Sequence, residues 1–86
     1  MEVNELIILV KNKIEKKVSV QNINIKDKTY LHHKHLSHQK GKFHLEITIA
    51  SDELRKYSKI EATKKIYKIL DEEIKQYIHS IQILIR

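Results

Sequence analysis

Hydrophobic residues in the first third of the chain change from a helical to a strand-like spacing. A helix is predicted from Asn4 to about Lys17, with Asn4 as its N-cap. Its apolar residues recur every three or four positions: Leu6, Ile7, Val10 and Ile14. From about Ser19 to Lys26 the chain carries β-branched residues that alternate with polar ones, which predicts a half-buried strand.

The clearest alternation follows in a second predicted strand. Apolar residues occupy one parity: Phe43, Leu45, Ile47 and Ile49. The other parity holds His44, Glu46 and Thr48, so we expect one face in the core and His44 exposed on the other. A polar segment, residues 27–42, separates the two strands, and loops of this length are usually functional or disordered.

The second half of the chain predicts a turn, a long helix and a last strand. Residues 51–56 suit a turn or a single helical turn, and Ser58 with Glu61 forms a capping box that starts the helix. Its buried stripe is predicted at Ile60, Tyr67, Leu70 and Ile74. In the strand from Ile78 to Ile85, His79 shares the parity of the isoleucines and is expected on the better buried side.

This order of elements predicts a single α+β domain over residues 1–86. A helix, two strands, a short turn or helix, a long helix and a strand would pack helices on a three-stranded sheet. The first two strands should be antiparallel. The long helix between the second and third strands favours a parallel pair, and therefore a mixed sheet.

Composition limits the chemistry that is possible. A chain of 86 residues can fold around one modest core without disulfides or a structural metal. It has no cysteine, so any metal site must use nitrogen or oxygen ligands unless a partner supplies sulfur. The apolar run from Leu6 to Val10 is far shorter than a membrane helix and has no basic flank, so a cytoplasmic protein without membrane association is expected.

The net charge of +6 raises nucleic acid, an acidic partner or an anionic membrane as possible targets. Only two of the 17 basic residues are arginine, and lysine lacks the planar fork that reads guanine, so loose electrostatic attraction is favoured over sequence readout. Candidate DNA contacts are Lys59, Lys64, Lys65 and Lys68 on the long helix. An ordinary solvated helix face would explain the same residues.

Six histidines are the most distinctive chemical feature. Five lie between His32 and His44, and His79 stands alone near the C-terminus. Imidazole is the commonest protein metal ligand. Zinc binding by the cluster alone lacks a definite ligand spacing, and such histidines are often merely solvated or hydrogen-bonded. No paired carboxylates, activated nucleophile or phosphate-binding loop is recognisable, so we do not expect an enzyme.

The segment from Phe43 to Asp52, the helix end from Leu70 to Ile74 and the residues from Ile78 to Ile81 together resemble the BolA-like family. The family pattern is a strand with an early histidine, a Ser-Asp turn, a helix that closes on leucine and acidic residues, and a hydrophobic-His-Ala-Leu motif. The resemblance implies a class II KH-like fold. It also implies binding to a monothiol glutaredoxin, with which such proteins share a bridging [2Fe-2S] cluster in cluster delivery or iron homeostasis. Some members instead act as DNA-binding transcriptional regulators of stress response or cell morphology.

By this resemblance His79 is the C-terminal cluster ligand. The second ligand comes from the loop and is His35, nine positions before His44, or else His38 or, less fittingly, His33. Glutaredoxin and glutathione supply the sulfur, so the isolated protein is expected to be a monomer without a cofactor. His44 either supports the site or is a solvated strand residue.

The chain departs from the family pattern at two places. Lys56 stands where members commonly carry a glycine, and Ala62, Thr63 and Lys64 replace an Arg-His-Arg run, so the positive charge is only partly retained. Gly41 is the only glycine. A Gly-x-x-Gly loop that brings backbone close to RNA phosphates is therefore impossible, and RNA recognition by the KH route is not expected.

Overall fold

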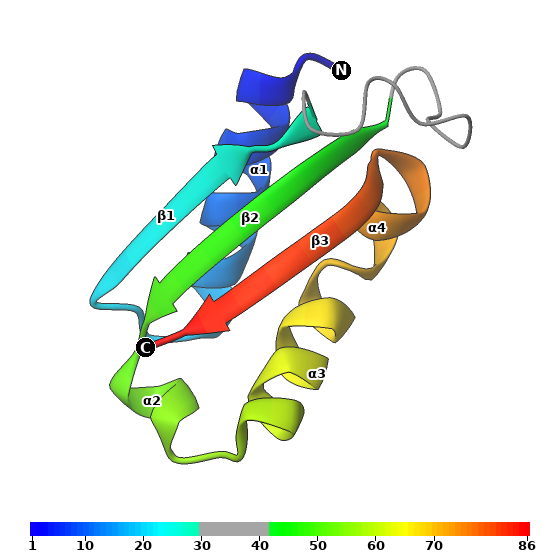
Figure 1. Cartoon of the computed structure of the whole chain (residues 1–86). Coiled ribbons are helices and arrows are strands. Elements are labelled where there is room, and N and C mark those ends of the chain that lie inside the picture. Colours follow the sequence, from blue (N-terminus) through cyan, green and yellow to red (C-terminus); the bar gives the residue numbers. More distant parts are fainter. Residues whose placement is uncertain (30–41) are drawn as a thin grey trace.

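The computed structural model describes residues 1–29 and 42–86, which form a three-stranded sheet with helices packed against it (Figure 1). The elements in chain order are α1 (Val3–Lys17), β1 (Asn22–Asp27), β2 (Phe43–Ala50), α2 (Asp52–Arg55), α3 (Lys59–Ile69), α4 (Asp71–Gln76) and β3 (Ile78–Ile85). The predicted α+β class is confirmed. Apart from the additional α4, this order is compatible with the class II KH-like topology implied by the resemblance.

The sheet has the predicted mixed topology, with strand order β1-β2-β3. β1 runs antiparallel to β2 and places Ile25 opposite Ile47. β2 runs parallel to β3 and places Ile47 opposite Ile83. The apolar parities of the three strands therefore face the same side.

That side of the sheet carries the core, as the alternation in β2 predicted. Leu45, Ile47 and Ile49 are at most 2% exposed. α1 crosses behind the sheet in Figure 1 and covers this face. The buried residues that the helices contribute are Leu6, Val10 and Ile14 from α1, Leu54 from α2, Ala62 and Ile66 from α3, and Leu70 at the α3–α4 junction. No helix in residues 1–29 or 42–86 is long and apolar enough to cross a membrane.

Two predicted helix details are wrong. α1 begins at Val3 with Glu2 at the N-cap position, and no side chain caps it, so Asn4 lies inside the first turn. The predicted long helix is divided at Leu70, whose backbone (φ −98°, ψ 17°) is not helical. The break lets fully buried Leu70 keep its place in the core while α4 takes a new direction.

The predicted buried stripe of the long helix is also wrong in part. Ile60 is 70% exposed and Tyr67 is 40% exposed, whereas Ala62 and Ile66 are fully buried. Residues 60 and 62 lie roughly 200° apart around a helix, so they cannot both face the core. The helix buries the side that carries Ala62, a residue small enough for close packing.

Serine hydroxyls define the turn after β2. Ser51 Oγ accepts a hydrogen bond from the Leu54 amide (3.1 Å) and donates one to the Ser19 carbonyl (2.6 Å). Ser58 Oγ accepts a bond from the Glu61 amide (3.1 Å), which confirms that Ser58 caps α3. These caps fix where α2 and α3 begin.

Candidate functional site

His79 lies at a break in the pairing of β2 with β3. Phe43 is opposite Ile78, but the next residue, His44, is opposite Ser80, so His79 is an extra residue in β3. This is a β-bulge. It shifts the side-chain parity by one position, so His79 is exposed although Ile81 lies opposite core residue Leu45. The prediction that His79 lies on the better buried side is therefore wrong, because strict alternation assumes an uninterrupted strand.

The prediction that His44 is exposed is also wrong. His44 is only 3% exposed, although its parity directs it away from the helix-packed face. Its ring centroid lies 4.9 Å from that of His79, with the ring planes tilted by 59°. Its backbone amide donates to Thr29 Oγ1 (3.1 Å), and Thr29 also bonds to Asp27 through its hydroxyl and its amide. These contacts hold the backbone of His44 at the end of the sheet. Asp27 and Thr29 were not identified from the sequence as residues of this site.

Both stems of the segment 30–41 are attached at this same end of the sheet. The Lys28 amide donates to the His44 carbonyl (2.7 Å), and the Phe43 amide donates to the Tyr77 carbonyl (2.9 Å). The segment that contains His35 and His38 is therefore joined to the sheet beside His79 at both of its ends. His33, His35 and His38 themselves lie outside the described residues, so the loop ligand stays a prediction.

The described histidines do not by themselves form a metal site. Within residues 1–29 and 42–86, no group of three or more His, Cys, Asp or Glu side chains could hold a metal ion. His79 and His44 supply two imidazoles, one exposed and one buried. Any metal centre at this position needs ligands from elsewhere.

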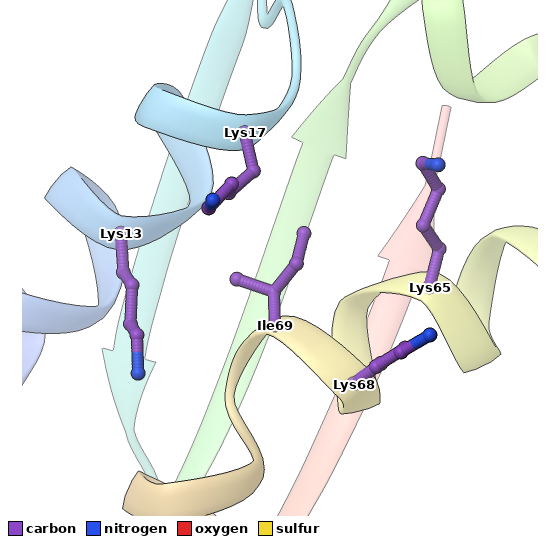
Figure 2. A pocket seen from close by; sticks show the side chains of 5 residues that line it. All are labelled: Lys13, Lys17, Lys65, Lys68 and Ile69. Carbon is purple, nitrogen blue, oxygen red and sulfur yellow. The ribbon is translucent and has the colours of Figure 1, made fainter.

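A second candidate site is a groove of about 370 Å³ between α1 and α3. Figure 2 shows its lining side chains, which come from both helices: Lys13, Lys17, Lys65, Lys68 and Ile69. We call it the lysine groove. Four lysine side chains and one apolar residue, Ile69, line it, and the Lys65 ammonium extends over the Tyr57 ring, 5.3 Å from the ring centroid.

One of these ammonium groups is already paired. Lys13 Nζ contacts both carboxylate oxygens of Glu73 (2.9 and 3.1 Å), and Glu73 is only 6% exposed. The hydrogen bond to Glu73 raises the pKa of Lys13 above its ordinary value. Among the described residues, Lys17, Lys65 and Lys68 have no carboxylate within ion-pair distance. The groove thus keeps net positive charge that can attract an anion.

A family model described as BolA-like protein matches residues 14–86. This chain belongs to the BolA-like family. A protein of Haemophilus influenzae named DNA-binding transcriptional regulator BolA is 26% identical over 73 residues, which cover 85% of this chain and 68% of that protein. The family membership expected from the sequence is confirmed.

Solved structures of BolA domains have the same fold as this BolA-like chain. The BolA domain of SufE1 from Arabidopsis thaliana superposes with a TM-score of 0.78 at 24% identity, covering 92% of this chain and 87% of that one. BolA1 from Arabidopsis thaliana gives 0.76 at 19% identity, covering 90% and 84%. At these identities the likeness establishes the fold.

The structure divides the predicted lysine set of this BolA-like chain. Lys65 and Lys68 line the lysine groove, whereas Lys59 and Lys64 border another hollow of α3. Lys13 and Lys17 were missed because they belong to α1, which the sequence does not visibly place beside α3. Their spacing of four residues at the end of a helix was the available signal.

Proposed function

We propose that this BolA-like chain is a non-catalytic adaptor that binds a monothiol glutaredoxin and co-ligates a bridging [2Fe-2S] cluster, for iron-sulfur cluster delivery or iron homeostasis. The exposed position of His79 on the bulge carries the proposal. Both stems of the segment that holds His35 and His38 start beside it. One of these two histidines is the second ligand in the proposal.

The donor chemistry fits a shared cluster better than a self-contained one. The chain has no cysteine, and its described residues offer no three-ligand group. Its imidazoles can therefore fill only part of the coordination, with sulfur from glutaredoxin and glutathione. Imidazole in place of thiolate raises the reduction potential of a cluster.

His44 has a positioning role in this proposal. Its buried ring lies against the His79 ring, and its amide is held by Thr29. Such contacts restrict the rotamers of the exposed imidazole before a partner arrives. Ordered ligands lose less entropy when they bind.

The test is a titration of cluster-loaded monothiol glutaredoxin with this protein, followed by visible absorption and circular dichroism. We expect a changed cluster spectrum with the wild type and with Ser80→Ala, a neighbouring exposed residue, and a different or absent change with His79→Gln. Separate His35→Ala and His38→Ala variants identify the loop ligand. An unchanged spectrum with the wild type, or identical changes with His79→Gln, would contradict the ligand assignment.

A second candidate function is DNA binding in transcriptional regulation. The lysine groove favours it, and the Haemophilus influenzae relative is named for that activity. Lysines act as point charges, so binding should depend on salt more than on sequence. Since Lys17, Lys65 and Lys68 are not paired with any carboxylate of residues 1–29 or 42–86, the slope of log K against log salt should be about −3.

Fluorescence anisotropy with a DNA duplex at several salt concentrations tests this function. Lys17→Glu with Lys68→Glu should abolish binding, whereas Lys11→Glu with Lys26→Glu makes the same change in net charge at exposed positions outside the groove. Absence of binding at low salt, or equal loss in both double variants, would contradict a DNA site in the lysine groove.

A further inference from the structure

β3 is an edge strand that lacks most of the usual protection against pairing. β2 lies on one side of it, and no strand of the described chain lies on the other (Figure 1). Its eight residues, Ile78–Ile85, include no charge and no proline. Natural edge strands are commonly protected by charges, prolines or bulges. The bulge at His79 interrupts only the start of β3, so residues 80–85 keep a regular edge.

The outer edge presents backbone groups at alternate residues. The Arg86 amide donates to the Ile49 carbonyl of β2 (2.8 Å), and every second residue of a parallel strand bonds to the same neighbour. Leu84 therefore faces β2, whereas Ile83 and Ile85 direct their amides and carbonyls outward. The Tyr67 hydroxyl donates to the Ile81 carbonyl from the outer side (3.4 Å), which agrees with this alternation.

A groove runs along this edge, between β3 and α3. A hollow of about 300 Å³ is lined by Lys59, Thr63, Ile83, Leu84, Ile85 and Arg86. An adjoining hollow on α3 is lined by Lys59, Ile60, Thr63, Lys64 and Tyr67. We call the two together the edge groove. It contains Ile60 and Tyr67, the large apolar residues that α3 exposes to solvent.

The rim of the edge groove is basic. Lys59, Lys64 and Arg86 are exposed, and within residues 1–29 and 42–86 none of them is paired with a carboxylate. A basic rim around apolar side chains selects a ligand with carboxylates around apolar side chains. The other edge strand, β1, offers no such combination because it carries Lys26 and Asp27 itself.

We propose that the edge groove binds an extended, acidic segment of a protein partner, which adds to β3 as a fourth strand. Main-chain hydrogen bonds to Ile83 and Ile85 supply the affinity in this mode of recognition. Side chains at alternate positions of the added strand point toward α3, where an apolar one lies beside Ile60 and a carboxylate faces Lys59 or Lys64. The edge groove lies at the opposite end of β3 from His79, so the proposal is independent of the cluster site, and its lining shares no residue with the lysine groove.

The test uses a short peptide with blocked ends, in which valine and glutamate alternate at every second position with threonine between them so that both lie on one face. Binding is followed by amide hydrogen exchange and NMR chemical shifts. We expect the peptide to slow exchange at Ile83 and Ile85, whereas Gln82 and Leu84 are already protected by β2. The same peptide with every backbone nitrogen methylated keeps its charge but cannot pair as a strand. It should give no protection, and neither should the same peptide with lysine in place of each glutamate.

Charge reversal supplies the matched variants. Lys59→Glu with Lys64→Glu should weaken peptide binding by about tenfold or more, whereas Lys11→Glu with Lys26→Glu should leave it unchanged. No binding at millimolar peptide, or equal binding of the methylated peptide, would overturn the proposal. So would protection of the β3 edge that rises with protein concentration in the absence of peptide, since a second copy would then be the occupant.

Discussion

Ser51 joins two separate parts of the fold through one buried hydroxyl, and its removal has a calculable cost. The side chain is fully buried, caps α2 through the Leu54 amide, and donates to the Ser19 carbonyl ahead of β1. Ser51→Ala removes a helix cap, which costs about 1 kcal/mol. It also leaves a carbonyl without its donor, which costs about 1 kcal/mol more. We expect the unfolding free energy to fall by about 2 kcal/mol and the melting temperature by roughly 8–16 °C.

Ser58 supplies the matched control, because it caps α3 with a bond of the same length but is exposed and makes no second side-chain bond within the described chain. Ser58→Ala should cost about 1 kcal/mol. Urea denaturation of both variants at neutral pH measures the difference, with the m-value unchanged. A cost for Ser51→Ala no greater than that for Ser58→Ala would refute the contribution assigned to the Ser19 bond.

Three further predictions concern charge and burial. The pKa of Lys13 is raised in the folded state, so its contact with Glu73 stabilises the fold fully below about pH 10.5, and this stability is lost as pH rises through the folded-state pKa. The urea midpoint of the wild type should therefore fall at alkaline pH, and Lys13→Met should make this fall smaller. His79→Gln should change the unfolding free energy by less than about 0.5 kcal/mol, because His79 is exposed. In urea denaturation Ile66→Ala should cost about 2–5 kcal/mol, whereas Ile60→Ala should cost less than about 0.5 kcal/mol. A large cost for either exposed residue would contradict its placement.

Strand alternation made most of the fold predictable. Burial on one face of β2 and the crossover before β3 together determine the mixed sheet. The helix errors have a different origin, because α3 is rich in apolar residues at several helical spacings. A stripe through Ile60 and Tyr67 and a stripe through Ala62 and Ile66 both satisfy a period of 3.6, so periodicity alone cannot decide which side is buried.

The candidate sites were less predictable, since they depend on contacts between distant segments. Resemblance to the family identified His79 as a candidate, while parity placed it on the wrong side of β3. The lysine groove needed the packing of Lys13 and Lys17 beside α3, which no local pattern encodes. The edge groove needed the outward position of Ile60, which follows only once Ala62 is known to face the core.

The spacing of isoleucines in β3 explains why His79 is exposed. Ile78 is buried opposite Phe43, and Ile81 lies opposite Leu45 on the same face, yet they are three residues apart. A strand of period two cannot place both on one face unless one residue is extra. Without the bulge, either Ile78 or the three later isoleucines would lose burial, at about 1 kcal/mol or more for each half-buried side chain. The bulge costs less than this because it disturbs the ladder at one position only. The hydrophobic pattern thus forces an extra residue between Ile78 and Ile81, and that residue is an exposed histidine beside the stems of the segment that carries four of the other histidines.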